Sequence, residues 1–324
     1  MPFKHHAARR HRIPKARYRV TNWPAYEAGL RRRGDFTFWL DEAALDGWAA
    51  PKRSTPGGQP VYSNLAIELV LTLRRVFHLG LRQAEAFTRS VLRLLGLDLP
   101  IPDHTTLSRR GRGFAGRKPR VAVGSGPVHL VLDSTGLQLF GQGEWDAEKH
   151  GRAKRRWLKL HLAVDADTSE IAAHVLTEGT ADDAAQVPTL LGQADGTIAS
   201  VIADGAYDGE PTYAAAAARQ RDPPPNVVIP PRASAVPSTD EAAVQTPRDR
   251  HIRLIAEKGR MAWQQATGYG RRSLGETAIG RYKHLIDPKL RARRLPGQQG
   301  EVTVAVQALN RMIRVAKPVS VRML

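Results

Sequence analysis

Two aspartates follow directly on short apolar runs that favour β-strands. Asp133 ends the run Val128-His-Leu-Val-Leu, and Asp204 ends Val201-Ile-Ala. Runs of this kind are typical of strands buried on both faces, which would hold each carboxylate rigidly. Taken alone, Asp133 could instead cap a turn formed by Ser134, Thr135 and Gly136. On neighbouring strands, however, the two aspartates would repel each other unless a cation lay between them. Oxygen ligands favour Mg²⁺ or Mn²⁺ as that cation.

A third carboxylate, Glu276, lies in a helical region with a tyrosine and two cationic side chains at regular spacing. Tyr269 stands seven residues before Glu276, Arg272 stands four residues before it, and Lys283 stands seven residues after it. At roughly 100° per residue, all four fall on one face of a continuous helix. An acid that holds a cation, beside bases that grip phosphates, suits a metal site bearing a phosphate chain. A simple surface ion pair would explain only Arg272 and Glu276.

The order of the predicted elements shows how these side chains could meet. Three hairpin-connected strands are followed by helix, strand, helix, strand and a long helical region: 128–133, 157–164, 171–176, 182–192, 200–204, 208–219, 226–229 and 249–285. A last helix is expected at about 301–315. Three antiparallel strands and two parallel ones predict a mixed five-stranded sheet covered by helices. The fourth strand can then pair beside the first, which would bring Asp133 and Asp204 together.

The first third of the chain predicts a separate helical module. Apolar residues at helical spacing favour helices from Ser63 to before Gly80 and from 81 to 95, and Asp103 is a good N-cap for a short third helix, 104–112. This third helix is polar and basic, and its exposed residues would be Thr105, Thr106, Arg109 and Arg110. We therefore expect a helix-turn-helix whose last helix enters a major groove, with a plain three-helix bundle as the alternative.

The charge points to a polyanionic partner. The 324 residues carry a net charge of +18. Residues 1–122 hold 23 of the 49 Lys and Arg but only 9 of the 31 Asp and Glu, which places a net +14 in this segment. We expect residues 1–22 to be a basic arm that is disordered without a partner. A second basic stretch precedes the strand at 157–164, and we expect Lys154, Arg155 and Arg156 in it to follow a DNA backbone.

Composition excludes several classes of protein. With no cysteine, there is no disulfide and no thiolate metal site, which is compatible with a reducing cytoplasm. No apolar run is long enough to span a bilayer, and the basic N-terminus has no apolar segment behind it, so it does not resemble a secretory signal. The Gly-, Arg- and Pro-rich stretch 111–127 predicts a linker. We expect a basic arm at 1–22, a helical DNA-binding domain at 23–122 and a catalytic domain at 123–324.

Together these motifs resemble a known enzyme family. Asp133 in LDSTGL, Asp204 in IADGAYD and the pattern Tyr269-x2-Arg272-x3-Glu276-x6-Lys283 look like a DDE transposase of bacterial insertion sequences, of the insertion-sequence-five-like group. The stretches GEWDAEKHGRAKRRWLKLHLAVD and DPKLRARRLPGQQGEVTVAVQALNRM are also similar to that group. The resemblance is strong over about 128–315 and looser over 60–120.

The resemblance implies a fold and an activity. The expected fold is α/β: an RNase H-like sheet of the retroviral-integrase type, preceded by an all-α helix-turn-helix-like domain. The expected enzyme binds the terminal inverted repeats of an insertion sequence, cleaves DNA ends and transfers strands into target DNA. Asp133, Asp204 and Glu276 would hold two Mg²⁺ ions, with Mn²⁺ as a substitute, in a bacterial cytoplasmic protein associated with the nucleoid. Because two transposon ends must be held together, a homodimer or larger assembly is expected.

Two other functions remain open at this point. A metal-dependent nuclease of the same fold would hydrolyse DNA without joining it. A domesticated DNA-binding protein would use only the helical module, although the intact acidic triad Asp133, Asp204 and Glu276 argues against it.

Overall fold

A computed structural model describes residues 17–41, 45–121, 126–141, 157–238 and 246–323. The chain divides into two compact units. One comprises residues 1–39 and 311–324, and the other residues 40–310. The boundary expected at 122–123 lies inside the second unit, so the division into a DNA-binding and a catalytic domain stays a prediction.

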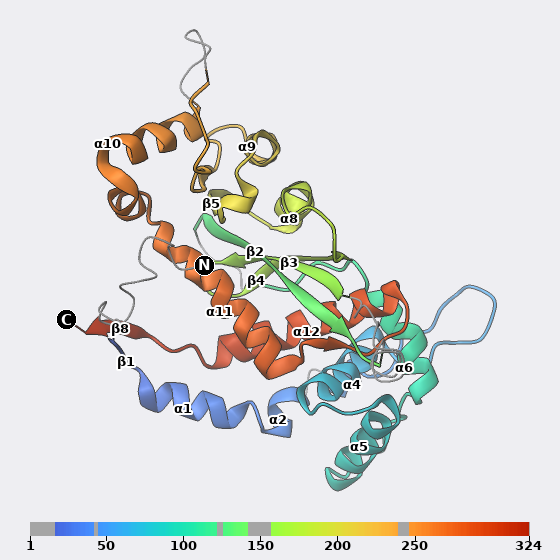
Figure 1. The fold of residues 1–324 in the computed structure, drawn as a ribbon. Coiled ribbons are helices and arrows are strands. Elements are labelled where there is room, and N and C mark those ends of the chain that lie inside the picture. The colour runs from blue at the N-terminus through green and yellow to red at the C-terminus, as the bar shows by residue number, and fades with distance from the viewer. Residues whose placement is uncertain (1–16, 42–44, 122–125, 142–156, 239–245, 324) are drawn as a thin grey trace, which may run out of the picture. The chain divides into compact units, whose positions relative to one another are not determined.

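The second unit is built on a mixed sheet with the order β4-β3-β2-β5-β6 (Figure 1). β2 is antiparallel to β3, which is antiparallel to β4, while β5 is parallel to both β2 and β6. The predicted pairing of the fourth strand beside the first is therefore confirmed. The five strands are β2 (Val128–Leu139), β3 (Trp157–Asp165), β4 (Ile171–Glu178), β5 (Ile198–Ile202) and β6 (Asn226–Val228).

The prediction of five strands was wrong by one. β7 (Lys289–Leu290) lies parallel to the end of β2, with Gln138 opposite Lys289 and Leu139 opposite Leu290. This pairing needs a β2 of twelve residues, whereas the sequence favoured a strand that weakens after Asp133. A two-residue strand is too short to show a period in the sequence.

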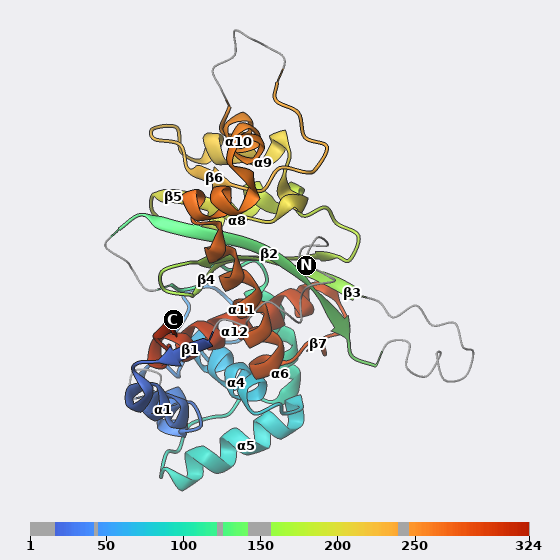
Figure 2. The same cartoon turned by 60° about the vertical axis from the view of Figure 1, so that its left-hand side comes forward.

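Helices cover both faces of the sheet. α8 (Val187–Gln193) and α9 (Glu210–Arg219) lie over one face, and α11 (Ser273–Arg281) lies over the other (Figures 1 and 2). Leu130 and Leu132 point into the core shared with α8 and α9. Because neighbouring strand residues point to opposite faces, Val131 and Asp133 point to the face that α11 covers. The alternation along β2 thus sends one carboxylate out of an otherwise apolar strand.

The predicted helical module is present in the same unit. It contains α4 (Asn64–Val76), α5 (Leu81–Leu94) and α6 (His104–Gly111), followed by a 3₁₀ turn, η2 (Arg112–Phe114). The Ser63 side chain caps α4 by accepting from the Ala66 N–H, and Asp103 caps α6 by accepting from the N–H groups of Thr105 and Thr106. α5 and α6 fall within one residue of their predicted bounds, and α4 begins one residue later and ends three residues earlier than predicted.

The long helical region expected at 249–285 is interrupted. α10 (Pro247–Thr267) departs from helical geometry at Gly259 and ends at Gly268, whose φ of 67° is left-handed. The 3₁₀ turn η5 (Tyr269–Arg272) follows, then α11, then a π-helical turn, η6 (Tyr282–Ile286). Gly268 ends α10 before all four residues of the predicted face, so the helix that carries them begins only at Tyr269. The expectation that Tyr269, Arg272, Glu276 and Lys283 share one regular α-helix was wrong, because the backbone changes from 3₁₀ to α to π geometry between them and the number of residues per turn changes with it.

The first unit pairs the two ends of the described chain. It contains β1 (Arg17–Val20), α1 (Trp23–Arg32) and α2 (Phe36–Trp39), and β1 is antiparallel to β8 (Ser320–Met323). The sequence had placed residues 17–20 in a disordered arm. This expectation was wrong for those four residues, because their backbone partners lie about 300 residues away and no local pattern announces them. α12 (Leu295–Val315) begins six residues earlier than predicted.

Candidate active site

β2 positions the first carboxylate of the predicted triad. The Asp133 side chain is only 13% exposed, and its Oδ1 accepts a hydrogen bond from the Ser134 N–H at 2.9 Å. The strand continues to Leu139, so the alternative in which Asp133 caps a turn is wrong. Burial raises the pKa of Asp133 above its ordinary value, although the Ser134 N–H and Arg272 oppose this shift. A buried carboxylate that is costly to ionise favours a nearby cation.

β5 brings the second carboxylate to the same edge. Val131 of β2 lies opposite Ile202 of β5, and Asp204 follows two residues later. The Asp204 Oδ1 accepts from the Ala206 N–H at 2.9 Å and caps the 3₁₀ turn η4 (Gly205–Tyr207). Its other oxygen, Oδ2, is left to face the site.

Arg272 joins all three acids. Its Nη2 lies 3.8 Å from Asp133 Oδ2 and 3.6 Å from Asp204 Oδ2, and its Nη1 donates to Glu276 Oε1. The Arg272 side chain is 18% exposed, whereas the Glu276 side chain is 56% exposed. Burial alone would lower the pKa of Arg272, but Asp133 and Glu276 outweigh it and the pKa is raised. The structure therefore brings the three predicted carboxylates around one positive charge.

These residues fit a divalent cation. Within the described part of the chain, no three acidic or histidine side chains are drawn together tightly enough to form a ready metal centre. Instead, the guanidinium stands where a cation is needed between Asp133, Asp204 and Glu276. Three carboxylates that surround a cation and include no sulfur or imidazole are the donor set that Mg²⁺ and Mn²⁺ prefer.

Tyr269 lies near the three carboxylates and packs against residues of α10 that the sequence analysis did not single out. Its ring centroid lies 5.0 Å from that of Trp263 in α10. The buried Trp263 donates its Nε1–H to His251 Nδ1 at 2.9 Å, and His251 Nε2 lies 2.8 Å from the Val227 carbonyl oxygen in β6. Burial raises the pKa of Tyr269. The chain from β6 to Tyr269 fixes the start of η5 and with it the approach to Arg272.

A second group of polar side chains lies beside Asp133, and the sequence gave little sign of it. His161 of β3 is opposite Ser134, and its buried ring places Nδ1 3.1 Å from Asp183 Oδ1 and Nε2 2.8 Å from Thr177 Oγ1. Lys159 Nζ lies 3.2 Å from Asp183 Oδ2. Burial lowers the pKa of His161. The His161 side chain is completely buried, so it packs in the sheet rather than facing solvent.

The buried Tyr207 phenol links this group to the carboxylates. Burial raises its pKa, and the negative charges of Asp183, Asp133 and Asp204 raise it further. The Ser134 side chain opposes this shift only in part. Tyr207 therefore stays neutral beside the acids.

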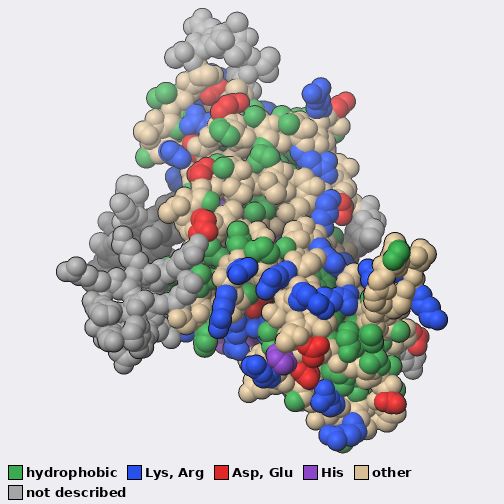
Figure 3. Space-filling model, turned by 90° about the vertical axis from the view of Figure 1, so that its right-hand side faces the viewer, with side chains coloured by type: hydrophobic (Ala, Val, Ile, Leu, Met, Phe, Trp, Pro, Cys, Tyr) green, Lys and Arg blue, Asp and Glu red, His purple; other side chains and the backbone are tan. Residues whose placement is uncertain are grey.

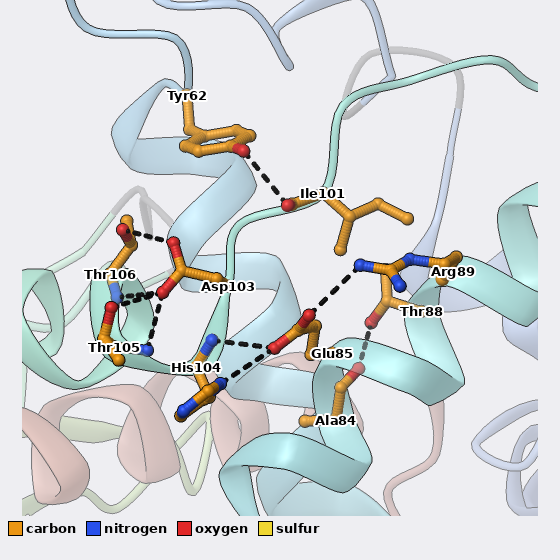
Figure 4. Close-up of polar contacts among 10 residues, drawn as sticks. All are labelled: Tyr62, Ala84, Glu85, Thr88, Arg89, Ile101, Asp103, His104, Thr105 and Thr106. Carbon is orange, nitrogen blue, oxygen red and sulfur yellow. Dashed lines mark hydrogen bonds and ion pairs between the residues drawn. The ribbon is translucent and has the colours of Figure 1, made fainter.

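The other predicted site residues do not contact the three carboxylates or lie outside the described residues. Lys283 lies in η6, beyond α11, and no contact joins it to the three acids among the described residues. Lys154, Arg155 and Arg156 lie outside the described residues. In α6, the hydroxyls of Thr105 and Thr106 both donate to the capping carboxylate of Asp103 (Figure 4).

The two arginines of α6 differ in what they contact. Arg110 donates to the Tyr62 carbonyl oxygen and, at 2.8 Å, to Asn64 Oδ1. Arg109 is exposed. Glu85 of α5 accepts from the His104 N–H at 2.9 Å and locks the start of α6 to α5 (Figure 4). Of the four predicted contact residues, Arg109 is the one whose side chain the fold leaves exposed and uncommitted.

The sequence of this chain matches two models of one kind of protein domain. Residues 124–311, more than half of the chain, match the family model of a transposase DDE domain, and residues 31–142 match a second model with the same description. A solved structure, the cryo-EM synaptic complex of piggyBac transposase with hairpin DNA, covers 92% of this chain and 77% of its own at 10% identity. The TM-score of this comparison is 0.38. No described helix is long and apolar enough to cross a membrane.

Proposed function

From the premise that this chain belongs to the family of transposase DDE domains, we propose that Asp133, Asp204 and Glu276 are its catalytic carboxylates. Enzymes of this family depend on divalent metal ions to cleave DNA and to transfer the cut strands, and their partner is DNA. The proposal rests on one observation: the Arg272 guanidinium lies within reach of all three carboxylates at once.

The three carboxylates would hold a pair of Mg²⁺ ions, with Mn²⁺ as a substitute. When bound, such ions activate a water or a DNA 3′-hydroxyl and stabilise the leaving oxygen of an in-line displacement. Asp133 is held rigidly by β2, whereas Glu276 is exposed on α11 and can turn toward an incoming ion. Arg272 would move from the acids to a DNA phosphate, because a guanidinium binds phosphate as it binds carboxylate.

The sheet order and the helices on both faces support an RNase H-like fold of the retroviral-integrase type. The helices α4, α5 and α6 support a helix-turn-helix-like DNA-binding region, with α6 as the element that reads the terminal inverted repeats. The excess of positive charge in residues 1–122 favours the same assignment. A homodimer or larger assembly on DNA follows from the need to hold two ends during joining.

The test uses the full-length protein, the terminal inverted repeats of its own element and Mg²⁺. Asp133→Asn, Asp204→Asn and Glu276→Gln should each abolish cleavage and joining, with end binding reduced less than threefold. Asp167→Asn is a matched control, since Asp167 pairs with Arg271 and not with the triad. Full activity in any triad variant would remove that residue from the site. Cleavage by the wild type without joining of pre-cut ends would instead indicate a nuclease.

A further inference from the structure

A second cationic site lies away from the triad, in a cavity of about 550 Å³ between α4, α6 and the start of α12. Six arginines line it: Arg74, Arg75, Arg112, Arg291, Arg293 and Arg294. Glu301 is the one acid among its lining residues. Arg291 also lies 3.5 Å from Asp287, which is outside the lining, so two carboxylates face six guanidinium groups. This excess of positive charge favours an anionic occupant.

The deepest of these arginines are incompletely neutralised. The Arg74 and Arg75 side chains are 8% and 4% exposed, and both contact Glu301, at 2.9 and 3.3 Å. Glu301 is shared further, because its Oε2 accepts from the N–H groups of Arg291 and Ala292. The buried Nε atoms of Arg74 and Arg75 have no hydrogen-bond partner among the described residues. Burying two guanidinium groups against one carboxylate leaves a positive charge that an anion would stabilise.

The outer arginines are available to a ligand. Arg293 and Arg294 are exposed. Across the described chain, the side chains of Arg112, Arg293 and Arg294 have no hydrogen bond or ion pair within the protein. Figure 3 shows Lys and Arg side chains gathered on the face where α6 and the start of α12 lie. Gly297, in the first turn of α12, also lines the cavity, so the positive end of the helix dipole adds to the arginines.

The size and walls of the cavity indicate more than a single phosphate. Leu71, Leu81, Leu107 and Val304 supply apolar surface beside the arginines. The volume lies within the range of small-molecule sites, roughly 300–1,000 Å³. A base can pack on leucine side chains or on a guanidinium plane while its phosphate meets the other arginines. A double helix is too wide to enter, so the occupant must be a single nucleotide or a strand end.

The cavity is also separate from the triad. Arg291 follows β7, whose partner Gln138 lies five residues beyond Asp133 on β2. At about 3.3 Å per residue, this is roughly 17 Å along the strand. A phosphate bound in the cavity therefore does not contact the three carboxylates.

We propose that this arginine-lined cavity binds a nucleotide through its phosphate and its base. The nucleotide has two possible sources: a free nucleoside polyphosphate, or an unpaired nucleotide of the bound DNA strand. The second source rests on the proposed function, and the first does not.

The test measures binding to the full-length protein by isothermal titration in EDTA, so that no metal bridges a probe to the triad. The probes are ADP and single-stranded hexathymidylate, in about 0.3 M NaCl to screen other surface charges. Arg293→Ala/Arg294→Ala should weaken binding at least tenfold, and so should Ser108→Phe, which fills the cavity without changing charge. Arg82→Ala/Arg93→Ala is the matched control, because it removes two exposed charges from α5 outside the cavity.

Binding of ADP at one site per chain, lost in both cavity variants, would identify a free nucleotide. Binding of hexathymidylate alone, lost in the same variants, would identify a DNA strand. No binding of either probe, or an equal loss in the α5 control, would overturn the proposal. Cleavage by the wild type is measured in parallel, so a failure of the cavity can be told from a failure of the catalytic assignment.

Discussion

A Cβ atom placed on Gly275 would lie 3.0 Å from the Cβ of Asp133 and 3.2 Å from its Oδ2. α11 therefore packs its backbone directly against β2 at Asp133. Because Glu276 is the next residue, the same close approach sets how far the third carboxylate stands from the first. A glycine in the middle of a helix weakens it, yet here it allows the site to form.

We expect Gly275→Ala to reduce cleavage and joining at least tenfold, since the added methyl must push α11 or Asp133 away. Gly280→Ala, in the same helix, is the control, because a Cβ there meets nothing within 4 Å. It should keep full activity and stabilise the helix by up to about 1 kcal/mol. End cleavage and thermal unfolding of both variants would check this. Equal activity in the two variants would show that the contact does not position Glu276.

Arg272 should act on the substrate more than on the metal. In Arg272→Ala, Mn²⁺ affinity without DNA should equal or exceed that of the wild type, because a competing cation has gone. Joining of pre-cut ends should fall by about tenfold or more, the loss expected of a charge-assisted phosphate contact worth roughly 1–3 kcal/mol. Arg271→Ala, which breaks a pair with Asp167 instead, should do neither. Lost Mn²⁺ affinity in Arg272→Ala would mean that Arg272 serves to order Glu276.

Lys283 is the second predicted phosphate contact, and its position is less favourable. It lies in η6, past the end of α11, so it no longer shares a straight helical face with Glu276. We expect Lys283→Ala to lower joining at most as much as Arg272→Ala, with Mn²⁺ affinity unchanged. Single-turnover joining of pre-cut ends would measure this. A larger loss than that of Arg272→Ala would place Lys283 nearer the reacting phosphate than η6 suggests.

The buried Asp133 should make metal binding depend on pH. A metal must displace the proton, and burial raises the pKa of this carboxyl above 3.8. As the pH decreases, Mn²⁺ affinity should therefore begin to fall at a higher pH than it would for a site built on an aspartate with the ordinary pKa. Mn²⁺ titrations of the metal-free protein over a pH series would show the decrease. In Asp133→Asn, most of the affinity and this part of its pH dependence should be lost together.

His174 should weaken the fold in mild acid. Its buried Nε2 lies 3.1 Å from the Thr303 hydroxyl, and burial lowers its pKa from 6.5 to about 4. The unfolded chain therefore binds the proton first. Stability is complete above pH 6.5 and falls as the pH decreases toward 4, by roughly 3 kcal/mol in total. Urea unfolding of the wild type and of His174→Gln would measure this, and the variant should lose less stability over the same range.

The reading of DNA by α6 should depend mainly on Arg109. Arg109→Ala should reduce discrimination between inverted-repeat and random DNA, by about 1–3 kcal/mol if it contacts a base, while thermal stability stays unchanged. Arg110→Ala should instead lower stability, because Arg110 ties α6 to Tyr62 and Asn64. Replacing Thr105 and Thr106 would remove donors to the Asp103 cap as well as any DNA contact. Unchanged discrimination in Arg109→Ala would place recognition on another element.

Much of the site was predictable because its signals are local. Apolar runs that end in Asp133 and Asp204 identified the two strands, and the predicted order of elements allowed these strands to lie side by side, as they do. The four-residue spacing of Arg272 and Glu276 survived the break in the helical region, since both residues lie within one turn of the start of α11. The capped helices α4 and α6 were also visible, because Ser63 and Asp103 are strong local signals.

Tertiary structure alone decided the features that join distant segments. The pairing of β1 with β8, and of β7 with the end of β2, depends on backbone groups that carry no sequence signature. The left-handed Gly268 placed Tyr269 on a turn against Trp263 rather than on a helical stripe. Above all, the sequence determined that three acids and an arginine are present. Only the packing of Gly275 on Asp133 decided that the arginine reaches all three, because that contact fixes the distance between a strand and a helix some 140 residues apart.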